Sequence, residues 1–172
     1  MFSGALRSRS LAAAVLVLGA GMAAPQSDPE LDVVSAALST AVAGGRSVVV
    51  LSHELSAQPG MAHAEGLMAD RLGRAFLEAY DSANASPRRL LVPLTVPGRT
   101  VVFEDQVPAR KPTDVMFVYR FTRVGFNSAH DTAMVGVYED CGMTCGSARH
   151  EIYVRSSAGW RRIGGVGASI QF

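Results

Sequence analysis

Two cysteines, Cys141 and Cys145, stand four positions apart in the stretch CGMTCGSARH, and Met143 and His150 lie close to them. Thiolate, thioether and imidazole groups are ligands for Cu(I) and other soft or borderline metal ions. A thiol pair can also exchange disulfides when a neighbouring cation lowers the pKa of one thiol. The third interpretation is structural, a local disulfide that closes a loop rich in glycine. The stretch is therefore either a metal or redox site or a structural disulfide.

The spacing of the two cysteines favours the structural disulfide. Cys141 and Cys145 would close a loop of about five residues, which stabilises the fold by about 2 kcal/mol in the chain-entropy estimate. Gly142 and Gly146 supply the backbone freedom that a tight loop needs. A redox pair usually sits at a helix N-terminus, and no helical pattern follows this one. We therefore predict a disulfide between the two cysteines.

A metal or redox site remains the alternative, formed by Cys141, Cys145, Met143 and His150. The pattern ARHEIYVR places His150 on the same strand face as Ala148, Ile152 and Val154, where a lone histidine is more often a satisfied core residue than a ligand. The opposite face would carry Arg149, Glu151, Tyr153 and Arg155. No cofactor is predicted.

Other catalytic patterns are weak. His53-Glu54 and His63-x-Glu65 do not form the H-E-x-x-H pattern of a zinc helix, and the chain has no G-x-S-x-G elbow, P-loop or G-x-G-x-x-G fingerprint. The sequence therefore leans away from an enzyme without excluding one.

The first 23 residues have the pattern of a signal peptide. Arg7 and Arg9 form a positive start, an apolar run from Leu11 to Ala20 follows, and small residues precede a cleavage point after Ala23. The apolar run is shorter than the roughly 20 residues that span a bilayer as a helix. We predict export to the periplasm or medium, a mature single domain over residues 24–172, and no transmembrane helix after cleavage.

The charge balance argues against nucleic acid as a partner. Removing Arg7 and Arg9 leaves 14 basic residues against 15 acidic ones, a net charge of about −1 with neutral histidines. No basic stripe runs along the mature chain, as nucleic-acid binding would require. The expected partner is an unknown ligand or protein of the cell envelope.

The first half of the mature chain alternates helix and strand patterns. Ser27 and Glu30 have the spacing of a capping box with Pro29 in the first turn, and Gly44 and Gly45 end the apolar helical stripe. A valine-rich strand is predicted over 47–51. A second helix is predicted over 64–83, with an apolar stripe at Met68, Leu72, Phe76, Ala79 and Ala83.

The second half is a series of strand patterns. They cover 115–126, 132–140, 148–155 and 160–165, with turns between them. These patterns predict an α+β fold in which two helices pack on an antiparallel meander of about 4–6 strands.

The same patterns suggest where a ligand could bind. A pocket between the second helix and the curved sheet would be lined by side chains from both, although ordinary core packing explains them better: Met68, Leu72, Phe76, Phe117, Tyr119 and Phe121.

About 50 residues of the C-terminal half resemble a group of exported bacterial proteins of unknown function. The shared features are an R-V-G-F-N turn, a C-G-x-x-C-G loop and a hairpin end with Gly-Trp. The chain departs from the group in the SARH stretch after the second cysteine. The resemblance implies the fold layout and export but brings no activity. It rests on Phe121, Arg123, Val124, Gly125, Phe126, Asn127, Cys141, Gly142, Cys145, Gly146, Gly159 and Trp160.

These observations predict a non-catalytic binding or interaction domain outside the cytoplasm, with one local disulfide. The alternative is a thiol-dependent redox protein or a copper-binding protein that uses the two cysteines.

Overall fold

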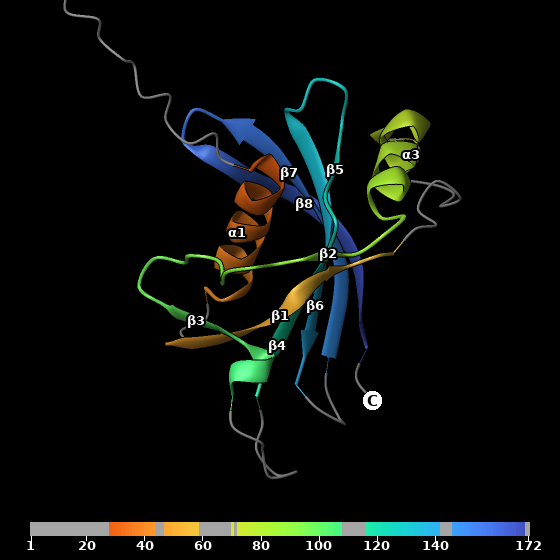
Figure 1. The fold of residues 1–172 in the computed structure, drawn as a ribbon. Coiled ribbons are helices and arrows are strands. Elements are labelled where there is room, and N and C mark those ends of the chain that lie inside the picture. The colour runs from red at the N-terminus through yellow and green to blue at the C-terminus, as the bar shows by residue number, and fades with distance from the viewer. Residues whose placement is uncertain are drawn as a thin grey trace, which may run out of the picture.

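A computed structural model describes residues 28–43, 47–58, 70, 72–107, 116–141 and 146–170 of the chain (Figure 1). The predicted signal peptide lies outside the described residues. The elements, in chain order, are α1 Pro29–Ala41, β1 Val48–Ser56, α3 Arg74–Ala83, β2 Arg88–Arg89, β3 Thr100–Phe103, the 3-10 helix η2 Glu104–Gln106, β4 Val118–Thr122, β5 Gly125–Phe126, β6 Thr132–Asp140, β7 Gly146–Ser156 and β8 Gly159–Ile170.

One sheet joins all the described strands. Its main path runs β2-β1-β4-β6-β7-β8, with β3 paired to β1 and β5 paired to β6. The α+β class is confirmed. The sheet is larger than predicted and is mixed, because β1 runs parallel to both β3 and β4. The prediction of a purely antiparallel meander is wrong for this half of the sheet and fits only the run from β4 to β8.

Helix α1 begins with a cap that differs from the predicted one. Asp28 is the N-cap residue, and its carboxylate accepts a hydrogen bond from the backbone N–H of Glu30 at 3.0 Å. Pro29 occupies the first turn as predicted. Because Glu30 reaches toward other segments instead of back to the cap, the predicted Ser27–Glu30 capping box is wrong.

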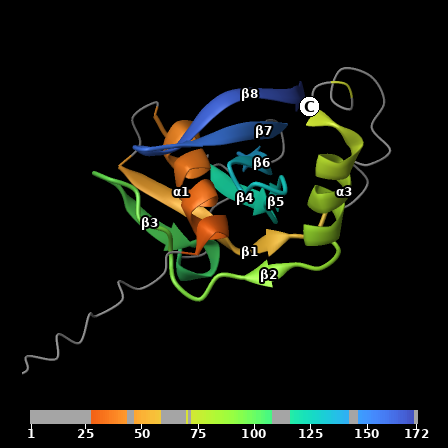
Figure 2. The same cartoon turned by 90° about the horizontal axis from the view of Figure 1, so that it is seen from above.

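The sheet curls around α1, which lies in its concavity between β1 and the β7–β8 hairpin (Figure 2). The helix buries one side against the concave face, as the apolar stripe predicted, with Val34 and Leu38 fully buried. Side chains from β1, β4, β6 and β7 complete this main core: Val49, Leu51, Leu55, Tyr119, Phe121, Ala133, Val135, Val137 and Tyr153.

Helix α3 lies on the other face of the sheet. Met134 packs with its side chains, whereas the neighbouring residues of β6, Ala133 and Val135, belong to the core under α1. Successive residues of a strand point to opposite faces, so the two helices cover opposite faces. The helix begins at Arg74, after Gly73 with φ 79°, and is therefore shorter than predicted. Most of the predicted range before Gly73 lies outside the described residues.

The predicted strand over 115–126 is divided into β4 and β5 at Arg123 and Val124. Both helices contact this break. Glu30 of α1 accepts hydrogen bonds from Arg123 Nε at 2.7 Å and from the Val124 backbone N–H at 3.0 Å. Asn84, just after α3, donates to the Arg123 carbonyl at 3.0 Å. The R-V-G stretch of the resemblance is thus the point where both helices are tied to the sheet.

Candidate functional site

The cysteine loop joins β6 to β7. The strands pair as far as Asp140 and Gly146, so the hairpin brings the two ends of the loop together. Cys141 is 8% exposed and is not a free thiol. Met143 and Cys145 lie outside the described residues. The strand pairing therefore places the two residues that flank the cysteine pair, Asp140 and Gly146, opposite one another.

His150 does not lie near Cys141. The register pairs His150 with Gly136, and Cys141 follows Gly136 by five residues, about 16 Å along an extended strand. His150 packs its ring against Tyr80 of α3 at 5.6 Å between centroids, and its Nε2 lies 3.2 Å from the Tyr80 hydroxyl. It acts as a half-buried packing residue. No group of three metal-ligating side chains occurs among the described residues.

The environment of His150 gives a pH prediction. Burial lowers the pKa of His150 below its ordinary value of 6.5. As the pH falls below about 6.5, the unfolded chain takes up a proton at this site that the folded chain resists. The free energy of unfolding should therefore fall as the pH drops, by at most about 1.4 kcal/mol per pH unit for one proton.

Urea unfolding at pH 7.5 and pH 5.5 measures this effect. His150→Gln should lose a large part of the difference in midpoint between the two pH values. His130→Asn is the matched control, because His130 is exposed in the turn before β6 and has φ 54°, which asparagine tolerates. An equal pH response in His150→Gln and the native chain would contradict the prediction.

The described residues of the predicted pocket are divided between two clusters. Leu72 and Phe76 pack in the cluster under α3, whereas Phe117, Tyr119 and Phe121 pack in the core under α1. The two groups lie on opposite faces of the sheet and cannot line one pocket. Met68 lies outside the described residues. The prediction paired the second helix with Phe117, Tyr119 and Phe121, whereas these strand residues face α1.

A different cluster of polar side chains lies on the concave face, and we call it the Glu151 cluster: Arg149, Glu151, Tyr153 and Arg162. Glu151 is only 1% exposed. One of its oxygens, Oε1, accepts a hydrogen bond from Arg149 Nε at 2.7 Å and lies 3.1 Å from Arg162 Nε. The other oxygen, Oε2, accepts from the Tyr153 hydroxyl at 2.6 Å.

The two strands position these side chains by their alternation and register. Arg149, Glu151 and Tyr153 share one face of β7, and Tyr153 is fully buried in the core under α1. The pairing of β7 with β8 shifts between Ile152 and Tyr153, so that Arg162 stands opposite Tyr153. Burial and the hydrogen bond to Glu151 raise the pKa of Tyr153, which keeps its hydroxyl protonated as a donor.

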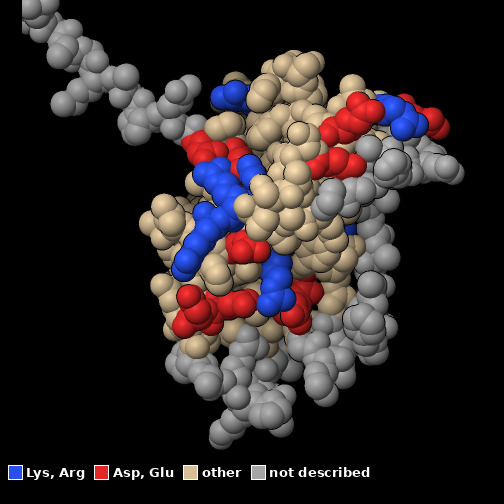
Figure 3. All heavy atoms as spheres, turned by 45° about the vertical axis from the view of Figure 1, so that its right-hand side comes forward, with Lys and Arg blue, Asp and Glu red and all other residues tan. Residues whose placement is uncertain are grey.

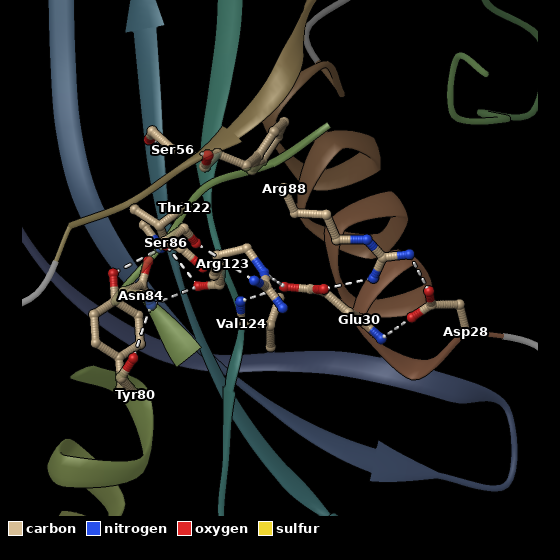
Figure 4. A network of polar contacts seen from close by, with 12 residues as sticks. Asp28, Glu30, Ser56, Tyr80, Asn84, Ser86, Arg88, Thr122, Arg123 and Val124 are labelled. Carbon is tan, nitrogen blue, oxygen red and sulfur yellow. Dashed lines mark hydrogen bonds and ion pairs between the residues drawn. The ribbon is translucent and has the colours of Figure 1, made fainter. Parts of the chain in front are cut away.

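A second buried glutamate provides a comparison, and we call its surroundings the Glu30 cluster: Asp28, Glu30, Arg88 and Arg123 (Figure 4). Glu30 accepts from Arg88 Nη1 at 2.6 Å as well as from Arg123 and Val124, and Asp28 also pairs with Arg88. These bonds join α1 to two segments far along the chain. The Glu30 cluster holds two carboxylates and two guanidinium groups, so its charges balance.

The Glu151 cluster differs from the Glu30 cluster in the segments that it joins and in its charge balance. Its charged side chains all come from one hairpin, and its link to another segment among the described residues is the Tyr153 hydroxyl, which is also hydrogen-bonded to Thr40 of α1. It holds two guanidinium groups and one carboxylate, with the arginine side chains 26% and 42% exposed. An arrangement of exposed donors fixed by a buried acid is suited to binding a negatively charged group.

Sequence reasoning missed this cluster because it assigned the opposite face of β7 to the core. The buried residues of β7 are Glu151 and Tyr153, while His150, Ile152 and Val154 are only partly buried. The signal that could have found it is the alternation Arg-x-Glu-x-Tyr, which places a carboxylate between two of its own partners on one face of a strand.

The charged side chains elsewhere are mixed in sign. On the face shown in Figure 3, basic and acidic side chains lie beside one another and do not form separate patches. Arg120, for example, pairs with both Glu104 and Asp140 at 3.0 Å. Within the described residues, no helix is long and apolar enough to cross a membrane.

Comparison with known proteins gives no relative for this fold and site. No family model, no curated protein and no solved structure matches the chain.

Proposed function

We propose that this protein is an exported, non-catalytic binding domain that takes its ligand on the concave face of the sheet, at the Glu151 cluster. The observation that carries the proposal is the buried carboxylate of Glu151, which holds two partly exposed arginines. Burying an acid without need is costly, and a fold keeps one only when it is paired and hydrogen-bonded. In the Glu30 cluster the same cost is offset by links between remote segments. In the Glu151 cluster the gain is the fixed orientation of two cationic side chains.

Export is the second part of the proposal. It rests on the signal-peptide pattern over residues 1–23 and on the cysteine pair, since disulfides persist in oxidising compartments outside the cytoplasm. The proposed bridge joins Cys141 to Cys145 across the β6–β7 loop. That Cys141 is not a free thiol supports the bridge. The alternative is a redox role, in which the pair would cycle between dithiol and disulfide, or a copper-binding role that uses the two thiols.

The bridge gives a stability prediction. Replacing both Cys141 and Cys145 with serine should lower the free energy of unfolding by about 2 kcal/mol, the loop-closure estimate for so short a loop. Binding on the concave face should remain, because the Glu151 cluster draws its side chains from residues outside this loop. Urea unfolding of the native chain with and without reductant, and of the double variant, measures the effect.

Thiol accessibility and copper binding decide between the bridge and its alternative. We expect both thiols to resist alkylation until the protein is reduced. Alkylation without reduction, or stoichiometric Cu(I) binding that the double serine variant loses, would favour the redox or copper role instead.

Fragment binding tests the proposed site. A library of small neutral and charged fragments would be titrated into ¹⁵N-labelled mature protein, followed by amide shifts. We expect saturable shifts grouped on β7 and β8 around Glu151, weakened at least tenfold in Glu151→Gln. Glu78→Gln, an exposed change on α3 at the other face, is the matched control and should leave them unchanged. Shifts grouped only elsewhere, or none, would count against the proposal.

A further inference from the structure

We infer that Arg149 and Arg162 bind an oxyanion, the carboxylate or phosphate group of a ligand. This inference rests on the proposed function, because it names the chemistry that the same site would recognise. The Glu151 cluster carries an excess of positive charge. Glu151 neutralises one of the two guanidinium groups, and both arginines are partly exposed at 26% and 42%.

Some nitrogen atoms of the two guanidinium groups remain available for a ligand. Glu151 is engaged by the Nε atoms of both arginines. Arg149 Nη1 donates to the Ser147 hydroxyl at 3.2 Å, and the Nη atoms of Arg162 have no hydrogen-bond partner among the described residues. A guanidinium group held through Nε presents its Nη edge, and two parallel N–H donors on that edge match the two oxygens of a carboxylate or phosphate.

The donor groups of the Glu151 cluster are held in fixed positions. Glu151 is 1% exposed, and its Oε2 atom accepts a hydrogen bond from the Tyr153 hydroxyl. Its Oε1 atom therefore holds the Nε atoms of both arginines at a fixed place. Gly165 leaves space beside Arg162, because a Cβ at that residue would lie 3.1 Å from Arg162 Nη2 and 2.7 Å from the His150 carbonyl. Ligand binding therefore requires little ordering of these side chains, which lowers its entropic cost.

The Glu30 cluster shows why the same inference does not extend to it. Its two guanidinium groups face two carboxylates, and Arg88 uses both Nη atoms in ion pairs with Asp28 and Glu30. Arg123 donates Nη1 to the Ser86 carbonyl as well as Nε to Glu30. The Glu30 cluster therefore lacks the unmatched charge of the Glu151 cluster, and within the described residues neither of its arginines leaves both Nη atoms without a partner, as Arg162 does.

The experiment titrates sodium phosphate and, separately, sodium acetate into labelled mature protein at constant ionic strength set with sodium chloride. Shifts of the Arg149 and Arg162 Nε–H signals and of the β7 and β8 amides report binding. We expect saturable shifts with at least one of the two anions, and the comparison between them identifies whether phosphate or carboxylate is preferred.

Three variants make the test specific. Arg162→Gln should weaken anion binding at least tenfold, and Arg162→Lys, which keeps the charge beside Glu151 but loses the planar donor edge, should weaken it by a similar factor. Arg161→Gln is the matched control, because Arg161 is exposed and stands opposite Val154 on the other face of the hairpin. It should bind like the native chain. Far-UV circular dichroism and thermal unfolding confirm that each variant is folded.

Three results would overturn the inference. One is the absence of saturable shifts with both anions, another is equal weakening in Arg161→Gln and Arg162→Gln, and the third is unchanged binding in the folded Arg162→Gln protein. If neutral fragments bind beside Glu151 while neither anion does, the oxyanion inference fails and the proposed binding site stands. If no fragment and no anion binds there, both fail.

Discussion

Replacing Glu30 with glutamine is expected to lower the free energy of unfolding by about 3 kcal/mol. Glu30 is 6% exposed and accepts from two guanidinium groups and one backbone N–H. Removing one member of a buried ion pair leaves the others without compensation, which typically costs about 3 to 5 kcal/mol. We take the lower end because Arg88 and Arg123 keep part of their contact with water. Urea unfolding followed by circular dichroism measures the change.

The matched control is Asp32→Asn, an acid half-buried in the same first turn of α1. It should change stability by less than about 0.5 kcal/mol, as surface substitutions away from buried networks usually do. An equal loss in the two variants would mean that the charge of the helix N-terminus matters and the Glu30 cluster does not. A loss below 1 kcal/mol in Glu30→Gln would contradict the role of Glu30 as the link between α1 and the break after β4.

The helices and most strands of this fold follow from local pattern. Three features lie near their predicted positions: the apolar stripe of α1, the pairing of β6 with β4 and β5, and the β7–β8 hairpin. Each of these patterns is satisfied by neighbours close in sequence. The pairing of β1 with β4 was not predictable in the same way. It joins Val50 to Val118 across a long stretch of chain, and nothing local to β1 selects a parallel partner over an antiparallel one.

The candidate site was missed for a related reason. Both faces of β7 carry a mixture of apolar and polar side chains, and periodicity alone cannot decide which face meets the larger core. Tyr153 and Glu151 face α1, whereas His150 faces α3 and is only partly covered. The decision depends on where the helices pack, and that is a property of the assembled sheet. Once Tyr153 is placed inside, Glu151 must follow it two residues away.

Gly125→Ala is expected to destabilise the protein by about 3 kcal/mol and to loosen α3 from the sheet. A Cβ at Gly125 would lie 2.6 Å from the Tyr80 Cβ and would also contact the Tyr80 backbone. The helix backbone must move to admit it, and overpacking of this kind typically costs about 1 to 3 kcal/mol, occasionally more. Tyr80 donates to the Thr122 hydroxyl at 2.9 Å, so a shift of α3 also disturbs that buried hydrogen bond.

Gly164→Ala is the matched control, because Gly164 also lies in a strand and a Cβ there meets no atom within 4 Å. It should be neutral or stabilising by up to about 1 kcal/mol, since alanine restricts the unfolded chain more than glycine does. Hydrogen exchange separates the two effects predicted for Gly125→Ala: amides of α3 should exchange faster, while amides of α1 keep their relative protection. If α1 and α3 lose protection together, Gly125 supports the whole sheet, and the close approach of α3 is not its particular role.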